Sequence, residues 1–150
     1  MSPDDTTPPQ TTIDSGPDAL TNSHYAAFTF SADETGSTFE CQLDGAAWAT
    51  CASPKEYSGV GDGAHTFAVR ASDAAGNTDP TPASRAWTVD SLGPTATILS
   101  APPAVTTSRD AEFTFNSEAG ARFECRLDGG TWGRCTSPQS YSGLSDGQHT

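Results

Sequence analysis

The sequence predicts an all-β protein made of two copies of a small antiparallel β-sandwich. Apolar and polar residues alternate over short runs, and Asp-Gly, Gly and Pro residues separate these runs. No helical periodicity occurs along the 150 residues. Short strands at close spacing without helices are typical of a β-sandwich.

One module is present twice. Residues 39–66 return at 123–150 with a constant offset of 84. A period this long, carrying core and turn residues together, indicates a tandem repeat of one domain. The main shared residues are Ile13, Phe28, Phe30, Phe39, Cys41, Leu43, Trp48, Cys51, Tyr57 and His65, which return as Ile98, Phe113, Phe115, Phe123, Cys125, Leu127, Trp132, Cys135, Tyr141 and His149.

The repeat predicts the domain boundaries. We expect a linker at 1–10, a first repeat at 11–90, a linker at 91–95 and an incomplete second repeat at 96–150. Pro residues should stiffen both linkers. The counterparts of residues 67–90 are not in the sequence, so the second repeat should lack its two closing strands.

We interpret both ends of the sequence, Met1 and Thr150, as the ends of a fragment from a longer array. Neither a basic nor an apolar leader segment follows Met1. The alternative is that a neighbouring chain donates the missing strands. In either case we expect the second repeat, taken by itself, to be less stable than the first. Its Phe113, Phe115 and Phe123 should be partly exposed.

The first strands follow from alternation. A weak strand is expected around 11–14, and a regular one at 26–32 places Phe28 and Phe30 on one face. Residues 33–36, Asp-Glu-Thr-Gly, form the next turn.

A hairpin is expected after this turn. The strand at 38–44 places Phe39, Cys41 and Leu43 on one face. Asp44-Gly45 then reverses the chain into a strand at 47–51, because Asp-Gly between alternating runs is a strong hairpin signal.

Pro54 interrupts the ladder before a short strand at 55–58, because proline has no N–H to donate. The two closing strands of the repeat come after this short strand and are the most regular. Strands at 65–71 and 85–90 follow, and their inward side chains should be Phe67, Val69, Ala71, Trp87 and Val89.

These motifs resemble the bacterial Ig-like repeats found along large secreted and surface proteins. The matching segments are Phe39-Glu-Cys-Gln-Leu-Asp-Gly45, Cys51-Ala-Ser-Pro54, Tyr57-Ser-Gly59, residues 62–77 and Trp87-Thr-Val-Asp90. The resemblance implies tandem Ig-like (fibronectin III-like) sandwiches. It also implies a role as spacer, adhesion module or accessory domain of a secreted enzyme.

The four cysteines lie in the two copies of the hairpin. The simplest pairing is Cys41 with Cys51 and Cys125 with Cys135, because opposed residues on antiparallel strands lie within disulfide range. Free buried thiols and one shared zinc site are the alternatives, although the spacing within each pair exceeds that of usual zinc sites. Disulfides would imply an oxidising compartment and export.

The charge balance excludes several partners. Seven Lys and Arg against 19 Asp and Glu give a net charge of −12. Such a surface repels phosphates, so nucleic acid and anionic membranes are not expected as partners. No apolar run is long enough to span a bilayer.

A calcium site is the one cofactor hypothesis. Asp73, Asn77 and Asp79 surround the turn at Gly76, and further acidic residues flank the linkers. Calcium requires six to eight oxygen ligands, and a solvated acidic surface with Asx turns is the favoured interpretation. The linker-flanking candidates are Asp4, Asp5 and Asp90.

No catalytic constellation is recognisable. His65 and His149 occupy the same position before a strand, where we expect each to bond nearby backbone. The recurring Trp48, Tyr57 and their counterparts Trp132 and Tyr141 could stack on sugars, but packing under loops is favoured.

The sequence therefore favours a non-catalytic extracellular spacer or stalk, in contact with neighbouring repeats of the same chain. One alternative is an adhesion or carbohydrate-binding module whose partner is a glycan or a host surface protein. Another is an accessory domain of a secreted hydrolase.

Overall fold

A computed structural model describes residues 5–150, and every regular element among them is a β-strand. The chain forms two compact units, Met1–Leu92 (unit 1) and Gly93–Thr150 (unit 2). The all-β class predicted from the sequence is confirmed.

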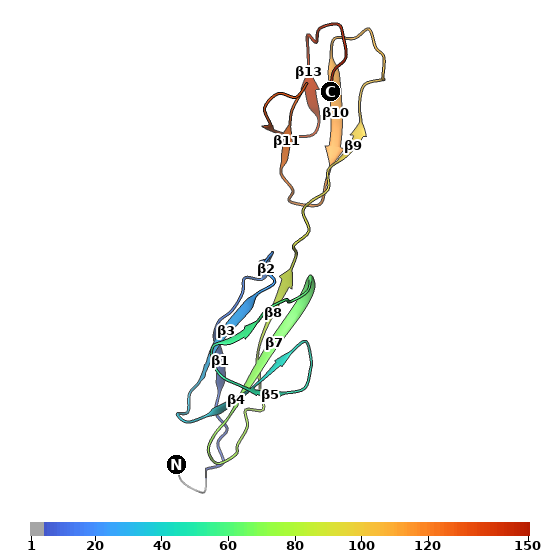
Figure 1. Ribbon diagram of the computed structural model, residues 1–150. Helices are drawn as coiled ribbons and strands as arrows, with labels where there is room; N and C mark the ends of the chain where they lie inside the picture. The colour runs from blue at the N-terminus through green and yellow to red at the C-terminus, as the bar shows by residue number, and fades with distance from the viewer. Residues whose placement is uncertain (1–4) are drawn as a thin grey trace. The chain divides into compact units, whose positions relative to one another are not determined.

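Unit 1 consists of two sheets that face each other (Figure 1). The first has the order β1-β3-β6 and the second the order β2-β8-β7-β4-β5. Their strands are β1 (Thr11–Ser15), β2 (Leu20–Thr21), β3 (Ala26–Ala32), β4 (Thr38–Leu43), β5 (Ala49–Cys51), β6 (Lys55–Tyr57), β7 (Gly63–Ser72) and β8 (Ala83–Val89). Two facing sheets of mainly antiparallel strands make unit 1 a β-sandwich-like fold.

The core of unit 1 lies between these sheets. Alternate residues of β3, β7 and β8 point inward, as their sequence pattern predicts. Phe28 stacks on Phe67 with ring centroids 4.0 Å apart, and Trp87 meets Phe28 edge-on at 5.3 Å. The buried core residues are Ala26, Phe28, Phe30, Cys41, Val60, Phe67, Val69, Ala71, Trp87 and Val89.

The hairpin turn after β4 follows from two residues that adopt positive φ. Asp44 has φ 50° and Gly45 has φ 73°. The Ala46 N–H donates to the Leu43 carbonyl at 3.0 Å and closes a turn of the type that matches strand twist. The predicted Asp-Gly turn is confirmed, although β5 begins at Ala49 rather than at 47.

The sequence analysis missed β2, which has only two residues. Leu20 and Thr21 pair in parallel with Thr88 and Val89 of β8. Leu20 is 67% exposed, so no apolar alternation marks this strand. It forms because β8 offers it a partner.

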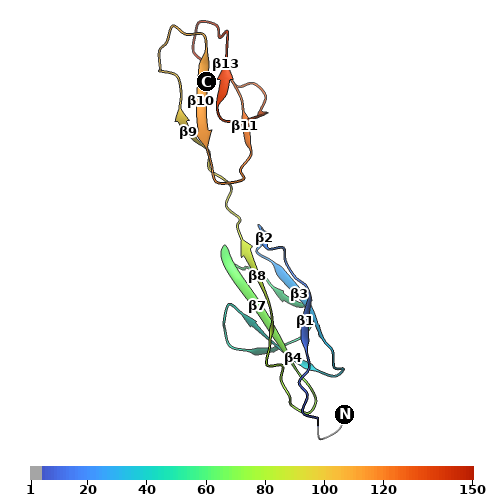
Figure 2. The same cartoon turned by 180° about the vertical axis from the view of Figure 1, so that it is seen from behind.

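Unit 2 repeats the first part of this plan (Figure 2). Its strands are β9 (Thr97–Ser100), β10 (Ala111–Asn116), β11 (Phe123–Cys125), β12 (Gly133–Cys135) and β13 (Gln139–Tyr141). They form a sheet of order β13-β10-β9 and a hairpin of β11 with β12. Nothing in unit 2 takes the places of β7 and β8.

The inward face of unit 2 is therefore less covered. Phe28 and Phe30 are 0% and 4% exposed in unit 1, whereas their counterparts Phe113 and Phe115 are only half-buried. Phe123 is also half-buried, like its counterpart Phe39. The expected partial exposure of the three unit 2 phenylalanines is confirmed.

Candidate functional site

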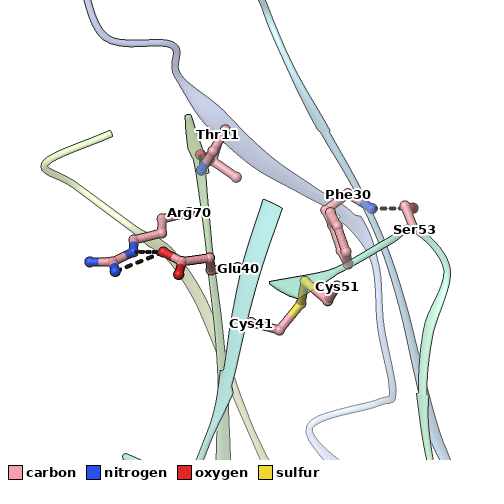
Figure 3. The surroundings of a disulfide bond; sticks show 8 residues. Thr11, Phe30, Glu40, Cys41, Cys51, Ser53 and Arg70 are labelled. Carbon is pink, nitrogen blue, oxygen red and sulfur yellow. Dashed lines mark hydrogen bonds and ion pairs between the residues drawn. A yellow bond between two sulfur atoms is a disulfide. The ribbon is translucent and has the colours of Figure 1, made fainter. Parts of the chain in front are cut away.

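Each hairpin carries a disulfide, which Figure 3 shows for unit 1. Cys41 is bonded to Cys51 and Cys125 to Cys135, with Cα atoms 5.8 Å apart in both pairs. No cysteine remains for the zinc or free-thiol alternatives. The two bridges indicate an oxidising, non-cytoplasmic environment.

The pairing geometry differs from the one expected. Cys41 lies opposite Ala49, and Cys51 lies opposite Phe39, so the disulfide joins diagonal rather than opposed residues. Diagonal neighbours usually lie about 7–8 Å apart. The right-handed twist of paired strands brings one of the two diagonals within reach of a disulfide.

His65 belongs to an arrangement that we call the histidine latch. Its Nδ1 lies 2.7 Å from Asp44 Oδ2, and its Nε2 lies 2.8 Å from the Gly61 carbonyl oxygen. The Thr66 N–H donates to the other Asp44 oxygen at 2.8 Å. The latch ties the turn after β4 to the beginning of β7.

The geometry of the latch favours the protonated form of His65. Both ring nitrogens face acceptor oxygens, so both fit as donors. The Asp44 carboxylate, and after it the Gly61 carbonyl, raise the pKa of His65 above its ordinary value. Partial burial alone would raise the pKa of Asp44, but hydrogen bonds from His65 and Thr66 outweigh it and lower that pKa.

Unit 2 contains the same latch. His149 Nδ1 lies 2.7 Å from Asp128, and its Nε2 lies 2.8 Å from the Ser145 carbonyl oxygen. The Ser145 carbonyl and then the Asp128 carboxylate raise the pKa of His149. A histidine with both nitrogens engaged has no free position to accept a substrate proton. The predicted backbone bond of both histidines is confirmed.

The predicted calcium residues divide into separate groups. The Asp79 carboxylate is buried and accepts the Thr11 N–H at 2.9 Å and the Thr81 N–H at 2.8 Å. Burial favours a raised pKa of Asp79, but these bonds prevail and lower it. Asp90 is not part of this group, and its carboxylate accepts a hydrogen bond from the Leu92 N–H. Asp79 and Asp90 are thus used within the fold.

Asp73 instead meets two acidic residues. Oxygen atoms of Asp5, Glu34 and Asp73 lie within 4.8 Å of one another, a group that we call the acidic cluster. Asn77 donates to Asp73 through its backbone N–H at 2.9 Å and its side chain at 2.8 Å. Its side chain also reaches the Asp5 carbonyl at 2.9 Å.

The sequence analysis missed one residue of the acidic cluster, Glu34. The remaining calcium candidate, Asp4, lies outside the described residues. Glu34 is in the turn after β3, at the same end of unit 1 as the turn around Asn77. Desolvation, followed by repulsion from Asp5 and Asp73, raises the pKa of Glu34. Three carboxylates suit a hard cation such as calcium, but they supply only part of its usual oxygen shell.

The recurring aromatic residues have two different roles. Tyr57 packs against Phe28 and Phe67, with centroids 6.3 and 6.1 Å apart, and Tyr141 packs against Phe113 at 6.3 Å. Packing is confirmed for both tyrosines.

Each tryptophan lies against an arginine side chain. Arg70 lies over the Trp48 ring at 4.4 Å, and Arg126 lies over the Trp132 ring at 4.6 Å. Trp132 is 58% exposed. The prediction was wrong for Trp132 because an arginine, not a loop, covers one face of its indole ring.

No known protein family matches the chain, and no curated protein has a similar sequence. No helix among the described residues could cross a membrane.

Proposed function

We propose that this chain is a non-catalytic structural spacer from a bacterial surface or secreted protein. One observation carries the proposal: the cysteines, histidines and tyrosines common to both copies serve folding. The shared cysteines form disulfides, the shared histidines form latches, and the shared tyrosines pack in the core.

A second shared contact supports the same proposal. The Ser53 hydroxyl accepts the Phe30 N–H at 3.0 Å (Figure 3), and Ser137 accepts the Phe115 N–H at 2.9 Å. These serines precede Pro54 and Pro138. Their hydrogen bonds connect the segment after each hairpin to the core strand, β3 in unit 1 and β10 in unit 2. The Ser-Pro motif is thereby explained by structure alone.

The strand order of unit 1 supports the Ig-like part of the proposal. Strands β1, β3 and β6 form one sheet, while β4, β5, β7 and β8 with the short β2 form the other. In Ig-like sandwiches the chain likewise alternates between two facing sheets. The disulfides, which suit an oxidising compartment, favour an extracellular location.

The mechanism of a spacer is resistance to extension. Repeats joined by short Pro-containing linkers keep attached domains apart, and the disulfides keep the hairpins closed when a unit opens. The acidic surface, with net charge −12, discourages self-association.

Single-molecule pulling on the chain tests this proposal. Unit 1 should unfold in one cooperative step, and reductant should lengthen that step by roughly 30 Å, the extended length of the chain between Cys41 and Cys51. Extension at negligible force, or an unchanged step after reduction, would contradict the spacer mechanism.

The exposure of Trp132 favours carbohydrate binding as a second candidate function. An exposed indole can stack on a sugar, and Arg126 beside it could donate to hydroxyl groups. Saturable glycan binding that a Trp132→Ala variant abolishes, with Trp48→Ala as the matched control, would favour this candidate over the spacer.

A further inference from the structure

We propose that Asp62 clamps the start of the linker to unit 1, so that the mobile part of the linker begins at Gly93 and not directly after β8. The Asp62 carboxylate accepts two hydrogen bonds from Ser91, one from the backbone N–H at 3.0 Å and one from the hydroxyl at 2.9 Å. Ser91 lies beyond the end of β8, which is at Val89. We call this contact between Asp62 and Ser91 the linker clamp.

The linker clamp consists of charge-assisted hydrogen bonds. The Ser91 N–H, and after it the Ser91 hydroxyl, lower the pKa of Asp62, so its carboxylate is ionised at neutral pH. Hydrogen bonds to an ionised acceptor are roughly twice as strong as those between neutral groups. Because both carboxylate oxygens bond the same residue, they restrict the position of Ser91 more than a single bond would.

The turn that carries Asp62 is itself fixed. His65 Nε2 lies 2.8 Å from the Gly61 carbonyl oxygen, as part of the histidine latch. The Val60 N–H donates to the His24 carbonyl at 2.9 Å, and His24 Nδ1 lies 2.6 Å from the Val60 carbonyl oxygen. The Val60 side chain is buried in the core. Asp62 therefore projects from a well-held turn and loses little conformational freedom when it binds the linker.

Unit 2 forms the same turn around Asp146, the counterpart of Asp62. The Leu144 N–H donates to the Arg109 carbonyl at 2.9 Å, as Val60 does to His24 in unit 1. The Asp146 carboxylate meets the Arg109 side chain at 3.3 Å. The turn thus keeps its hydrogen bond when its aspartate has a different partner, so contact with the linker is not what shapes it.

Successive N–H groups fix the chain from the end of β8 to Leu92. The Asp90 N–H donates to the Thr21 carbonyl at 2.8 Å. The Ser91 N–H forms the linker clamp, and the Leu92 N–H donates to the Asp90 carboxylate at 3.2 Å. Leu92 is 74% exposed, so apolar packing does not hold this segment. The linker clamp is the contact that ties the chain beyond Asp90 to another segment of unit 1.

The chain after Leu92 is held differently. In the described part of the chain, residues 93–96 take part in no turn, loop or side-chain hydrogen bond, and all four are exposed. A Cβ on Gly93 would meet no heavy atom within 4 Å, and glycine has the widest choice of backbone angles. Motion should therefore begin at Gly93, and the clamp narrows the range of directions in which the chain leaves unit 1. This effect does not require that the chain serve as a spacer.

NMR relaxation of the backbone amides in the full chain tests the proposal. We expect order parameters of about 0.85 at Ser91 and Leu92, typical of rigid backbone, and below about 0.6 at Gly93. Asp62→Ala should lower the values at Ser91 and Leu92 to below about 0.6. It should also accelerate amide hydrogen exchange at Ser91 at least about tenfold. Order parameters in β7 and β8 should stay unchanged, which shows that unit 1 remains folded.

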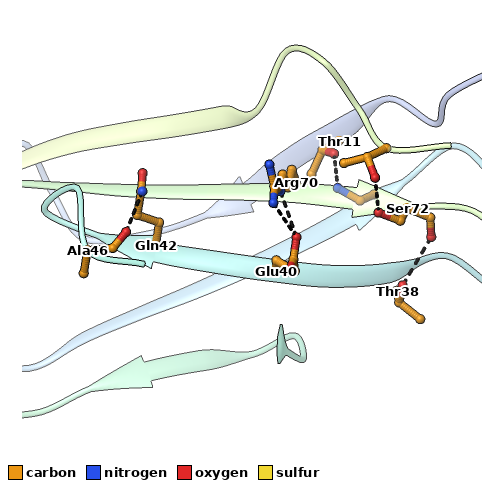
Figure 4. Close-up of polar contacts among 9 residues, drawn as sticks. Thr11, Thr38, Glu40, Gln42, Ala46, Arg70 and Ser72 are labelled. Carbon is orange, nitrogen blue, oxygen red and sulfur yellow. Dashed lines mark hydrogen bonds and ion pairs between the residues drawn. The ribbon is translucent and has the colours of Figure 1, made fainter. Parts of the chain in front are cut away.

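Glu40→Gln is the matched control, because it removes a carboxylate from another polar contact of unit 1. Glu40 of β4 pairs with Arg70 of β7 at 2.7 Å, as Figure 4 shows. These two strands are already joined by their ladder, so Glu40→Gln should leave the order parameters of residues 91–93 unchanged. Ser91→Ala removes the hydroxyl bond and keeps the N–H bond, so its effect should be smaller than that of Asp62→Ala.

The unaltered chain can overturn the proposal without any variant. Order parameters at Ser91 and Leu92 as low as that of Gly93 would do so. Order at Ser91 that survives Asp62→Ala would also overturn it, as would an equal loss of order in Glu40→Gln. A loss in Asp62→Ala, with a weaker one in Ser91→Ala and none in Glu40→Gln, would support the linker clamp.

Discussion

Units 1 and 2 share their local features but differ in burial. The disulfide Cα distance is 5.8 Å in both, and both latches have the same two histidine distances, 2.7 and 2.8 Å. Phe28, however, is fully buried, whereas Phe113 is half-buried. Turns, bridges and latches therefore form from residues within one segment, while the core requires β7 and β8.

The largest expected effect tests this difference at matched phenylalanines. Phe28→Ala should destabilise unit 1 by about 3–5 kcal/mol, because it leaves a cavity in a closed core. Phe113→Ala should cost unit 2 roughly 1 kcal/mol, since a half-buried ring loses fewer contacts. Denaturation followed by residue-resolved NMR measures both losses in one chain. Equal losses would mean that the two faces are equally covered.

Removing the disulfides should produce the next largest effect. Cys41→Ala with Cys51→Ala should destabilise unit 1 by roughly 2–3 kcal/mol, the entropy expected for a loop of this length. Unit 1 should remain folded because its core is closed. Cys125→Ala with Cys135→Ala should unfold unit 2, as measured by amide dispersion in NMR spectra. A folded unit 2 without its bridge would show that its open core is sufficient.

The effect of the latch on the pH dependence of stability should be smaller than the effects of these substitutions, and it should be similar in both units. The raised pKa of His65 stabilises the fold below about pH 6.5, and this contribution disappears as the pH rises through the folded pKa. The lowered pKa of Asp44 stabilises the fold above about pH 4 and is lost as the pH falls through it. Thermal stability should therefore be greatest between about pH 4 and 6.5.

A His65→Gln variant provides the control for this prediction. It should lower the Tm of unit 1 by a few degrees at about pH 6 and by less at about pH 9. A loss independent of pH would indicate that the imidazolium form is not the one that the latch stabilises.

The acidic cluster should give the smallest effect, and only in unit 1. Glu34→Gln should raise the Tm of unit 1 by about a degree at neutral pH, because it removes repulsion from Asp5 and Asp73. Calcium at about 5 mM should leave the Tm unchanged, because three carboxylates supply too few ligands. A calcium-dependent rise in the Tm that Glu34→Gln abolishes would identify the cluster as a metal site. Unit 2, which has no such cluster among its residues, is the internal control.

The sequence was sufficient for features that depend on neighbouring residues. Alternation placed β3 at Ala26–Ala32, and the Asp44-Gly45 pair predicted the turn. The hairpin predicted the bond between Cys41 and Cys51, and its second copy predicted the bond between Cys125 and Cys135.

Features that depend on distant segments were not predictable in the same way. β2 exists through pairing with β8, and Glu34 reaches Asp73 only because two turns meet at one end of unit 1. The diagonal disulfide depends on strand twist, and the stacked Trp132 depends on Arg126 beside it. Sequence spacing contains none of these distances.

The central claim is that the shared residues build the fold and that β7 and β8 complete it. Hydrogen exchange of the full chain, resolved by segment, tests this claim most directly. The account predicts strong protection of β3 and β4 in unit 1 and much weaker protection of β10 and β11 in unit 2. Equal protection of the two pairs of strands would contradict it.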